Sequence, residues 1–156
     1  MTSSFRVAPA EPADAPHLSL IAHAAKAHWG YPSEWLDRWK AELDFTEAFI
    51  IQHPVFKLLT ADEEVIGCCA FMEEGPTLWV DRLWVLPEYI GKGLGRKLFR
   101  EALGRIVRPT HLQLKVVSDP NAVGFYEKEG FELEGYEGSW PEGRRLPVLS
   151  CRNFFL

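Results

Sequence analysis

The chain has 156 residues, of which 47% are hydrophobic and 13% aromatic, and its 17 Lys and Arg against 22 Asp and Glu give a net charge of −5. This length and apolar content predict a single domain over residues 1–156 with one packed core, and they exclude disorder of the whole chain. The acidic balance excludes a protein that mainly neutralises nucleic acid, so any anion site must be built locally.

The cysteines and the first residues indicate a compartment. Cys68, Cys69 and Cys151 have neither the even number of a disulfide framework nor the spacing of a metal site, which predicts reducing conditions and no metal. The chain does not begin with a basic stretch followed by an apolar one, and no apolar run reaches about eighteen residues. The sequence therefore predicts a cytoplasmic protein without membrane contact.

In chain order, the first elements are a strand and two helices. The apolar run 5–10 predicts a strand, and Asp14 is expected to cap a helix over 15–29, where apolar residues recur every three or four positions. Ser33 is expected to cap a second helix, over 33–43, with one apolar face.

Strand patterns follow. The apolar run 49–51 indicates a short strand, and 55–60 and 65–72, with a polar turn between them, predict an antiparallel hairpin. The run 78–86 is apolar at both odd and even positions, which predicts a strand in the middle of a sheet, buried on both faces.

The second half alternates helices and strands. An apolar stripe predicts a helix from Leu94 to Ile106, a strand follows at 112–117, and a short helix at 122–129. Strands at 131–136 and 146–155 complete the chain. The resulting order predicts an α/β fold.

A glycine-rich loop joins the strand at 78–86 to the next helix. Gly91, Gly93 and Gly95 let the backbone come close to a ligand, and a helix N-terminus adds N–H groups and partial positive charge. The loop could simply reverse the chain, but an oligophosphate would also fit there. The spacing excludes a Walker loop and a dinucleotide fingerprint. Four basic side chains lie nearby: Lys92, Arg96, Lys97 and Arg100.

Two segments resemble those of a known family. The sequence LWVLPEYIGKGLGRKL at 83–98 resembles the acetyl-CoA signature of the GNAT superfamily of N-acyltransferases, and DPNAVGFYEKEGF at 119–131 resembles the later helix of that family. Ile90 stands where the family usually has Gln or Arg. Asp119 stands where Asn is often found, so Asp119 and Asn121 are alternatives for a contact with CoA.

The resemblance implies a mixed, largely antiparallel sheet flanked by helices, with acetyl-CoA as co-substrate. The backbone at Leu83, Trp84 and Val85 would hold the pantetheine arm and the thioester. The diphosphate would lie on the amides of the loop, and Asn121 is a further cofactor contact. The implied loop residues are Gly91, Lys92, Gly93, Leu94, Gly95 and Arg96.

The resemblance also assigns a general acid, while the base stays open. Tyr126 matches the family tyrosine that protonates the leaving thiolate, and a phenol of pKa about 10 is protonated at neutral pH. Asp81, inside an apolar run, is a candidate base whose pKa burial would raise. Glu73, Glu74 and bulk water are the alternatives, and Asp81 could instead serve a structural ion pair.

The acceptor site is expected among aromatic side chains. In the family the first two helices wall this site, which makes Trp29 and Tyr31 candidates, and Trp79 lies on the strand of the proposed groove. Trp35 and Trp39 are four residues apart, as a buried helix face requires. The aromatic ending 153–156 could pack within the sheet or across a homodimer.

These observations predict an enzyme that transfers acetyl from acetyl-CoA directly to a primary amine of a small molecule or peptide. Cys68 and Cys69 lie mid-strand, which disfavours a covalent cysteine intermediate. The alternatives are a non-catalytic acyl-CoA sensor and an acyltransferase that uses longer acyl groups.

Overall fold

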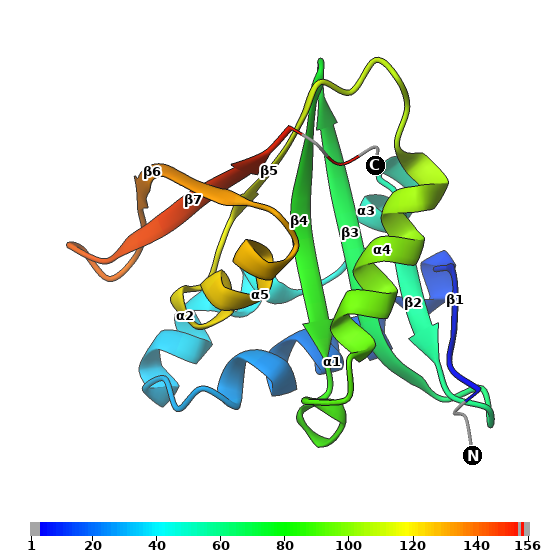
Figure 1. Ribbon diagram of the computed structural model, residues 1–156. Coiled ribbons are helices and arrows are strands. Elements are labelled where there is room, and N and C mark those ends of the chain that lie inside the picture. The colour runs from blue at the N-terminus through cyan, green and yellow to red at the C-terminus, as the bar shows by residue number, and fades with distance from the viewer. Residues whose placement is uncertain (1–3, 153, 155–156) are drawn as a thin grey trace. The chain divides into compact units, whose positions relative to one another are not determined.

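The computed structural model describes residues 4–152 and 154 of the chain (Figure 1). Its seven strands follow the hydrogen-bonded order β1-β2-β3-β4-β5-β7-β6 in one mixed, mostly antiparallel sheet, which confirms the predicted fold class. The strands are β1 (Arg6–Pro9), β2 (Val55–Leu59), β3 (Val65–Glu74), β4 (Thr77–Val85), β5 (Gln113–Val117), β6 (Glu132–Gly138) and β7 (Arg145–Cys151). The helices are α1 (Ala15–Ala27), α2 (Ser33–Leu43), α3 (Glu47–Gln52), α4 (Leu94–Ile106) and α5 (Val123–Lys128).

Contacts divide the described residues into two compact units. The first unit holds residues up to 70 together with 82–106, and the second holds 71–81 together with the residues from 107 onward. Both β3 and β4 run through the two units. The expectation of a single domain stays a prediction.

In the first unit, helices cover strands β1, β2 and the adjoining part of β3. The two pairings β1–β2 and β2–β3 are antiparallel, which confirms the predicted hairpin. Helix α4 packs on β1 and β2, and it lies in front of the strands in Figure 1, with α1 and α3 behind them. The apolar stripe predicted for α4 is its buried face: Leu94, Leu98, Phe99, Ala102 and Leu103.

In the second unit, β4 pairs in parallel with β5, and β7 lies antiparallel between β5 and β6. Helix α5 connects β5 to β6, and Gly130 ends it with a φ of +98°. Edge strand β6 is mostly exposed, whereas Leu114, Val116 and Leu149 of the inner strands are buried. The predicted strand 146–155 is observed to Cys151, and its positions 153 and 155, like residue 156 of the aromatic ending, lie outside the described residues.

One predicted strand is wrong. The apolar run 49–51 lies in helix α3, because the hydroxyl of Thr46 accepts a hydrogen bond from the Phe49 N–H at 3.0 Å and starts a helical turn. Only Ile50 of this run is buried, as expected when a short helix places one side chain per turn on the core.

Both predicted helix caps are also corrected. Asp14 stands at the start of α1, but its carboxylate makes no cap bond there; it accepts instead from the Glu11 N–H and from Lys57. Ser33 is the first residue of α2, whose N-cap position is Pro32, and no side chain caps this helix. Within the described ranges, no helix is long and apolar enough to cross a bilayer.

Candidate active site

The glycine loop has the backbone geometry that an anion cradle requires. Gly91 and Gly93 have φ of +85° and +75°, a region that other residues rarely adopt, and a Cβ at either position would meet no heavy atom within 4 Å. The Lys97 N–H donates to the Gly93 carbonyl at 3.2 Å. The amides of Leu94 and Gly95 precede this bond and have no acceptor within the helix. The loop therefore fits a diphosphate.

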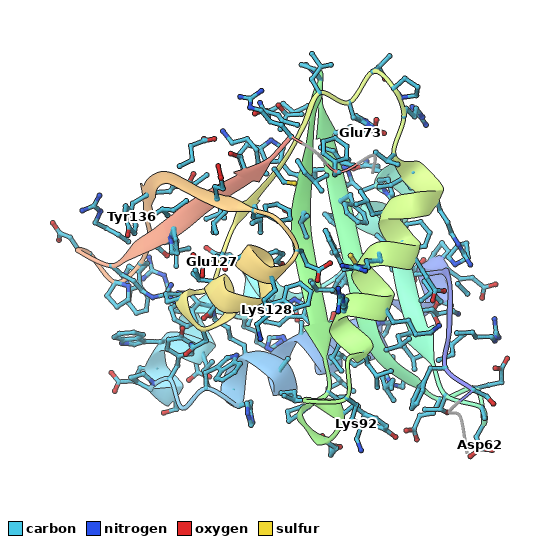
Figure 2. All side chains as sticks on the ribbon, viewed as in Figure 1. Asp62, Glu73, Lys92, Glu127, Lys128 and Tyr136 are labelled. Atoms are coloured by element: carbon cyan, nitrogen blue, oxygen red, sulfur yellow. The ribbon has the colours of Figure 1, made fainter. Side chains whose placement is uncertain are left out.

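Basic side chains surround this loop. Lys92 is exposed at the turn before α4 (Figure 2), and Arg96 and Arg100 are exposed on the first turns of that helix. Lys97 forms an ion pair with Glu101 one turn further on, so part of its charge is already compensated. The cluster predicted from the sequence is therefore present, and its charge complements an anion at the positive end of α4.

The strand segment Leu83, Trp84 and Val85 is half-buried and closely held by β3. A Cβ on Gly67 would lie only 3.0 Å from the Trp84 carbonyl oxygen, which is tighter than most Cβ contacts, so glycine lets β3 pass close to this segment. The Leu86 N–H donates to the Ile66 carbonyl at 2.9 Å. The first unit thus holds the predicted thioester strand in a fixed place.

In the second unit, the end of β3, the middle of β4 and the end of β5 form a cleft of about 240 Å³. It is lined by Met72, Glu73, Glu74, Trp79, Val80, Asp81 and Val117. The structure thus brings together the predicted base Asp81, both alternative bases and the aromatic candidate Trp79. The expected burial of Asp81 is wrong, because its side chain is exposed.

Glu73 is held by two partners at the end of the β3–β4 hairpin (Figure 2). His111, 2% exposed, accepts the Arg108 N–H at its Nδ1 (3.0 Å), so its Nε2 carries the proton and donates to Glu73 Oε2 at 2.8 Å. The Arg108 guanidinium lies 3.7 Å from the same oxygen. Both partners already engage the carboxylate of Glu73. The sequence pattern carried no signal for His111.

Trp79 already faces an ammonium group of the chain. Lys115 Nζ lies 5.2 Å from the centre of the Trp79 ring and also pairs with Glu134, whose pKa is lowered chiefly by that hydrogen bond. The Trp79 ring therefore already contacts one of the chain's own cations.

Tyr126 is buried in α5, with 5% of its surface exposed. Its ring packs edge-on against Phe125 and Phe131, with centroids 5.1 and 5.3 Å away. In the preceding turn, Asp119 Oδ1 accepts from both the backbone and the side-chain amide of Asn121. The two alternatives for a CoA contact thus bind each other, and the geometry does not choose between them.

The remaining acceptor candidates, Trp29 and Tyr31, differ in exposure. Trp29 is 44% exposed at the end of α1, whereas Tyr31 packs against Trp35 and Trp39. Trp39 is buried, as predicted for a helix face. Lys26, which sequence reasoning missed, is 8% exposed, and its Nζ lies 4.9 and 4.8 Å from the Tyr31 and Trp39 ring centres. The chain's own cation therefore fills the space beside Tyr31.

Comparison with known proteins decides the family. A family model described as "Acetyltransferase (GNAT) domain" matches residues 52–133, a segment that contains the cleft strands, the glycine loop and Tyr126. The chain belongs to the GNAT family. It is accordingly an acyl-CoA-dependent acetyltransferase, as the resemblance of its two segments implied.

Individual relatives agree with this assignment. The peptidyl-lysine N-acetyltransferase YjaB of Salmonella typhimurium is 27% identical over 113 residues, which cover 72% of this chain and 74% of that protein. Among solved structures, the PaiA N-acetyltransferase of Thermoplasma acidophilum in complex with coenzyme A has a TM-score of 0.80 at 22% identity, covering 96% of this chain and 99% of its own. The apo form of YjaB from Escherichia coli has a TM-score of 0.63 at 23% identity, with 96% of each chain covered. These structures share the fold.

Proposed function

We propose that this GNAT enzyme transfers the acetyl group of acetyl-CoA directly to a cationic primary amine, with a lysine side chain as the first candidate. The observation that carries the choice of acceptor is the cleft in which Glu73, Glu74 and Asp81 accompany the Trp79 ring. Carboxylates and an indole face together favour an alkylammonium ion. A relative named for peptidyl-lysine acetylation supports the same class.

On this proposal, the diphosphate of acetyl-CoA lies on the amides of Gly91–Arg96, and Lys92 and Arg96 add positive charge. The backbone of Leu83–Val85 holds the thioester end, and its amides polarise the carbonyl. The support for these roles is the positive φ of two loop glycines together with the amides at the start of α4.

The transfer itself needs proton movements at the amine, at the leaving thiolate and at the new amide nitrogen. The ammonium group first loses a proton to Asp81, directly or through water, and the neutral nitrogen forms a C–N bond with the thioester carbonyl carbon. When the C–S bond breaks, Tyr126 gives its proton to the leaving thiolate, and the nitrogen, which carries two protons after the attack, loses one of them to solvent. Tyr126 then regains a proton from solvent and Asp81 releases the one it took, so that one proton is released per transfer. The products are the N-acetyl amine and CoA.

The cysteines support direct transfer. Cys68 and Cys69 are fully buried in β3, and burial raises the pKa of the Cys68 thiol to about 12 and that of Cys69 well above its ordinary value. Since the thiolate is the nucleophile, these thiols are inert near neutral pH. Cys151 is buried as well.

We therefore expect no acyl-enzyme. Incubation with radiolabelled acetyl-CoA, without amine and followed by denaturation and gel filtration, should leave well under 0.1 equivalent of label on the protein, because the buried thiols of Cys68 and Cys69 are not activated. A Cys68→Ala/Cys69→Ala double variant should keep the turnover of its folded fraction. Stoichiometric label on a cysteine would contradict direct transfer.

Asp81→Asn should lower kcat/KM for the amine about tenfold to a hundredfold, because the amide cannot accept a proton. Asp62→Asn, in the exposed turn between β2 and β3, is the control of equal charge change. If Asp81→Asn keeps the wild-type kcat/KM, water or another carboxylate is the base.

The experiment that tests the proposal as a whole is CoA release against an amine panel of lysine peptides, polyamines, neutral arylamines and N-terminal amines. Lysine peptides should give the highest kcat/KM. Stabilisation by acetyl-CoA without CoA release from any amine would instead indicate a sensor, and faster turnover with a longer acyl-CoA would indicate a different donor.

A further inference from the structure

The side chain of Arg82 lies where β4 meets the end of α2 in the first unit. Its Nη1 lies 2.7 Å from the Asp44 carbonyl oxygen and 3.5 Å from that of Leu43, the last residue of α2. Carbonyls at a helix C-terminus lack partners within the helix and carry partial negative charge. The guanidinium therefore satisfies acceptors that the helix itself leaves open.

The same guanidinium contacts two aromatic rings. Its central carbon lies 4.5 Å from the centre of the Phe45 ring and 4.4 Å from that of Phe49, and these two rings meet edge to face at 5.8 Å. A planar guanidinium with several donors can stack flat on rings while its edge donates to carbonyls, a geometry that a compact ammonium does not have. Arg82 thus binds segment 43–49 through both its backbone and its side chains.

Segment 43–49 depends on such contacts because it has little stability of its own. Helix α3 comprises six residues, too few for an isolated helix to persist in water, and the segment belongs to no strand. On its other side, Ser19 Oγ of α1 accepts from the Phe45 N–H at 2.8 Å, and His23 pairs with Asp44 at 2.6 Å. Arg82 ties the segment to β4.

We propose that Arg82 is a positioning residue for acetyl transfer. It directly precedes Leu83–Val85, the segment to which the proposed function assigns the thioester, so it sets how closely segment 43–49 lies to the reacting carbonyl. The inference rests on that proposed function. A displacement of about 1 Å beside reacting groups can lower the rate of transfer about a hundredfold, even when the donor binds normally.

Arg82→Met keeps the apolar stem and removes the guanidinium. It should lower kcat/KM for the amine about tenfold or more, while the Kd of acetyl-CoA stays within about twofold, because β3 still holds the thioester strand. Arg82→Lys restores the positive charge without the planar guanidinium and should recover only part of the lost kcat/KM. Hydrogen exchange of the amides in 45–52 should quicken in Arg82→Met and remain slow at Leu83–Val85.

Arg105→Met is the matched control. Arg105 of α4 likewise donates to a backbone carbonyl, that of Val7 at 2.8 Å, and lies 5.9 Å from the Phe56 ring centre, but it ties α4 to β1 and β2. This variant should lose stability without losing kcat/KM. Three results would overturn the role of Arg82. The two variants could lose kcat/KM equally, or Arg82→Met could lose as much affinity for acetyl-CoA as it loses kcat/KM. Arg82→Met could also keep the wild-type kcat/KM. If the wild type acetylates no amine, the proposed function itself fails.

Discussion

Tyr126→Phe should lower kcat at least tenfold and leave the Kd of acetyl-CoA nearly unchanged. The substitution removes one oxygen and retains the ring, so the edge contacts with Phe125 and Phe131 and the burial of the helix face persist. General acid catalysis contributes about 10²- to 10⁴-fold, and water supplies part of it when the side chain cannot. Single-turnover rates and isothermal titration with CoA separate the chemical step from binding.

Tyr136→Phe supplies the control within the same unit. Tyr136 lies on β6, is 54% exposed and stacks with Arg145, and Figure 2 shows it on the edge strand. Losing its hydroxyl should leave kcat unchanged within about twofold. A Tyr126→Phe enzyme with wild-type turnover would remove this residue from the mechanism, whereas loss of folding in this variant alone would indicate a structural hydroxyl.

Elements with long, regular patterns could be predicted from the sequence. Helix α4 could be predicted because six apolar residues follow one stripe over three turns. The hairpin of β2 and β3 could be predicted because a polar turn separates two apolar runs. Helix α3 was not readable, because three consecutive apolar residues fit a buried strand or a helix equally well. The cap on Thr46, three residues upstream of Phe49, was the available signal.

The candidate site was predictable to the same extent. Strand alternation placed Trp79 and Asp81 on one face, and both line the same cleft. The burial of these two side chains was not predictable, because it depends on which elements cover that face of the strand. Asp81 proved exposed. Partners remote in sequence, such as Arg82 with Phe45 or His111 with Glu73, leave no periodic trace in a single chain.

The largest loss of cofactor binding is expected from Gly93→Val, which should weaken the affinity for acetyl-CoA more than tenfold. An L-residue at a φ of +75° carries about 1–2 kcal/mol of steric strain, which the loop can relieve only by leaving its present conformation. The branched side chain would also fill the open space in front of the amides of α4, where the diphosphate is proposed to lie.

Gly143→Val separates these two effects. Gly143, in the loop between β6 and β7, has a φ of +90° and equally open surroundings, so its substitution costs comparable strain away from the glycine loop. Both variants should lose a few degrees in melting temperature, but only Gly93→Val should lose the further stabilisation that acetyl-CoA adds to the wild type. Because bound ligand stabilises only a chain that binds it, equal acetyl-CoA shifts in the two variants would place the diphosphate elsewhere, whatever their basal stability.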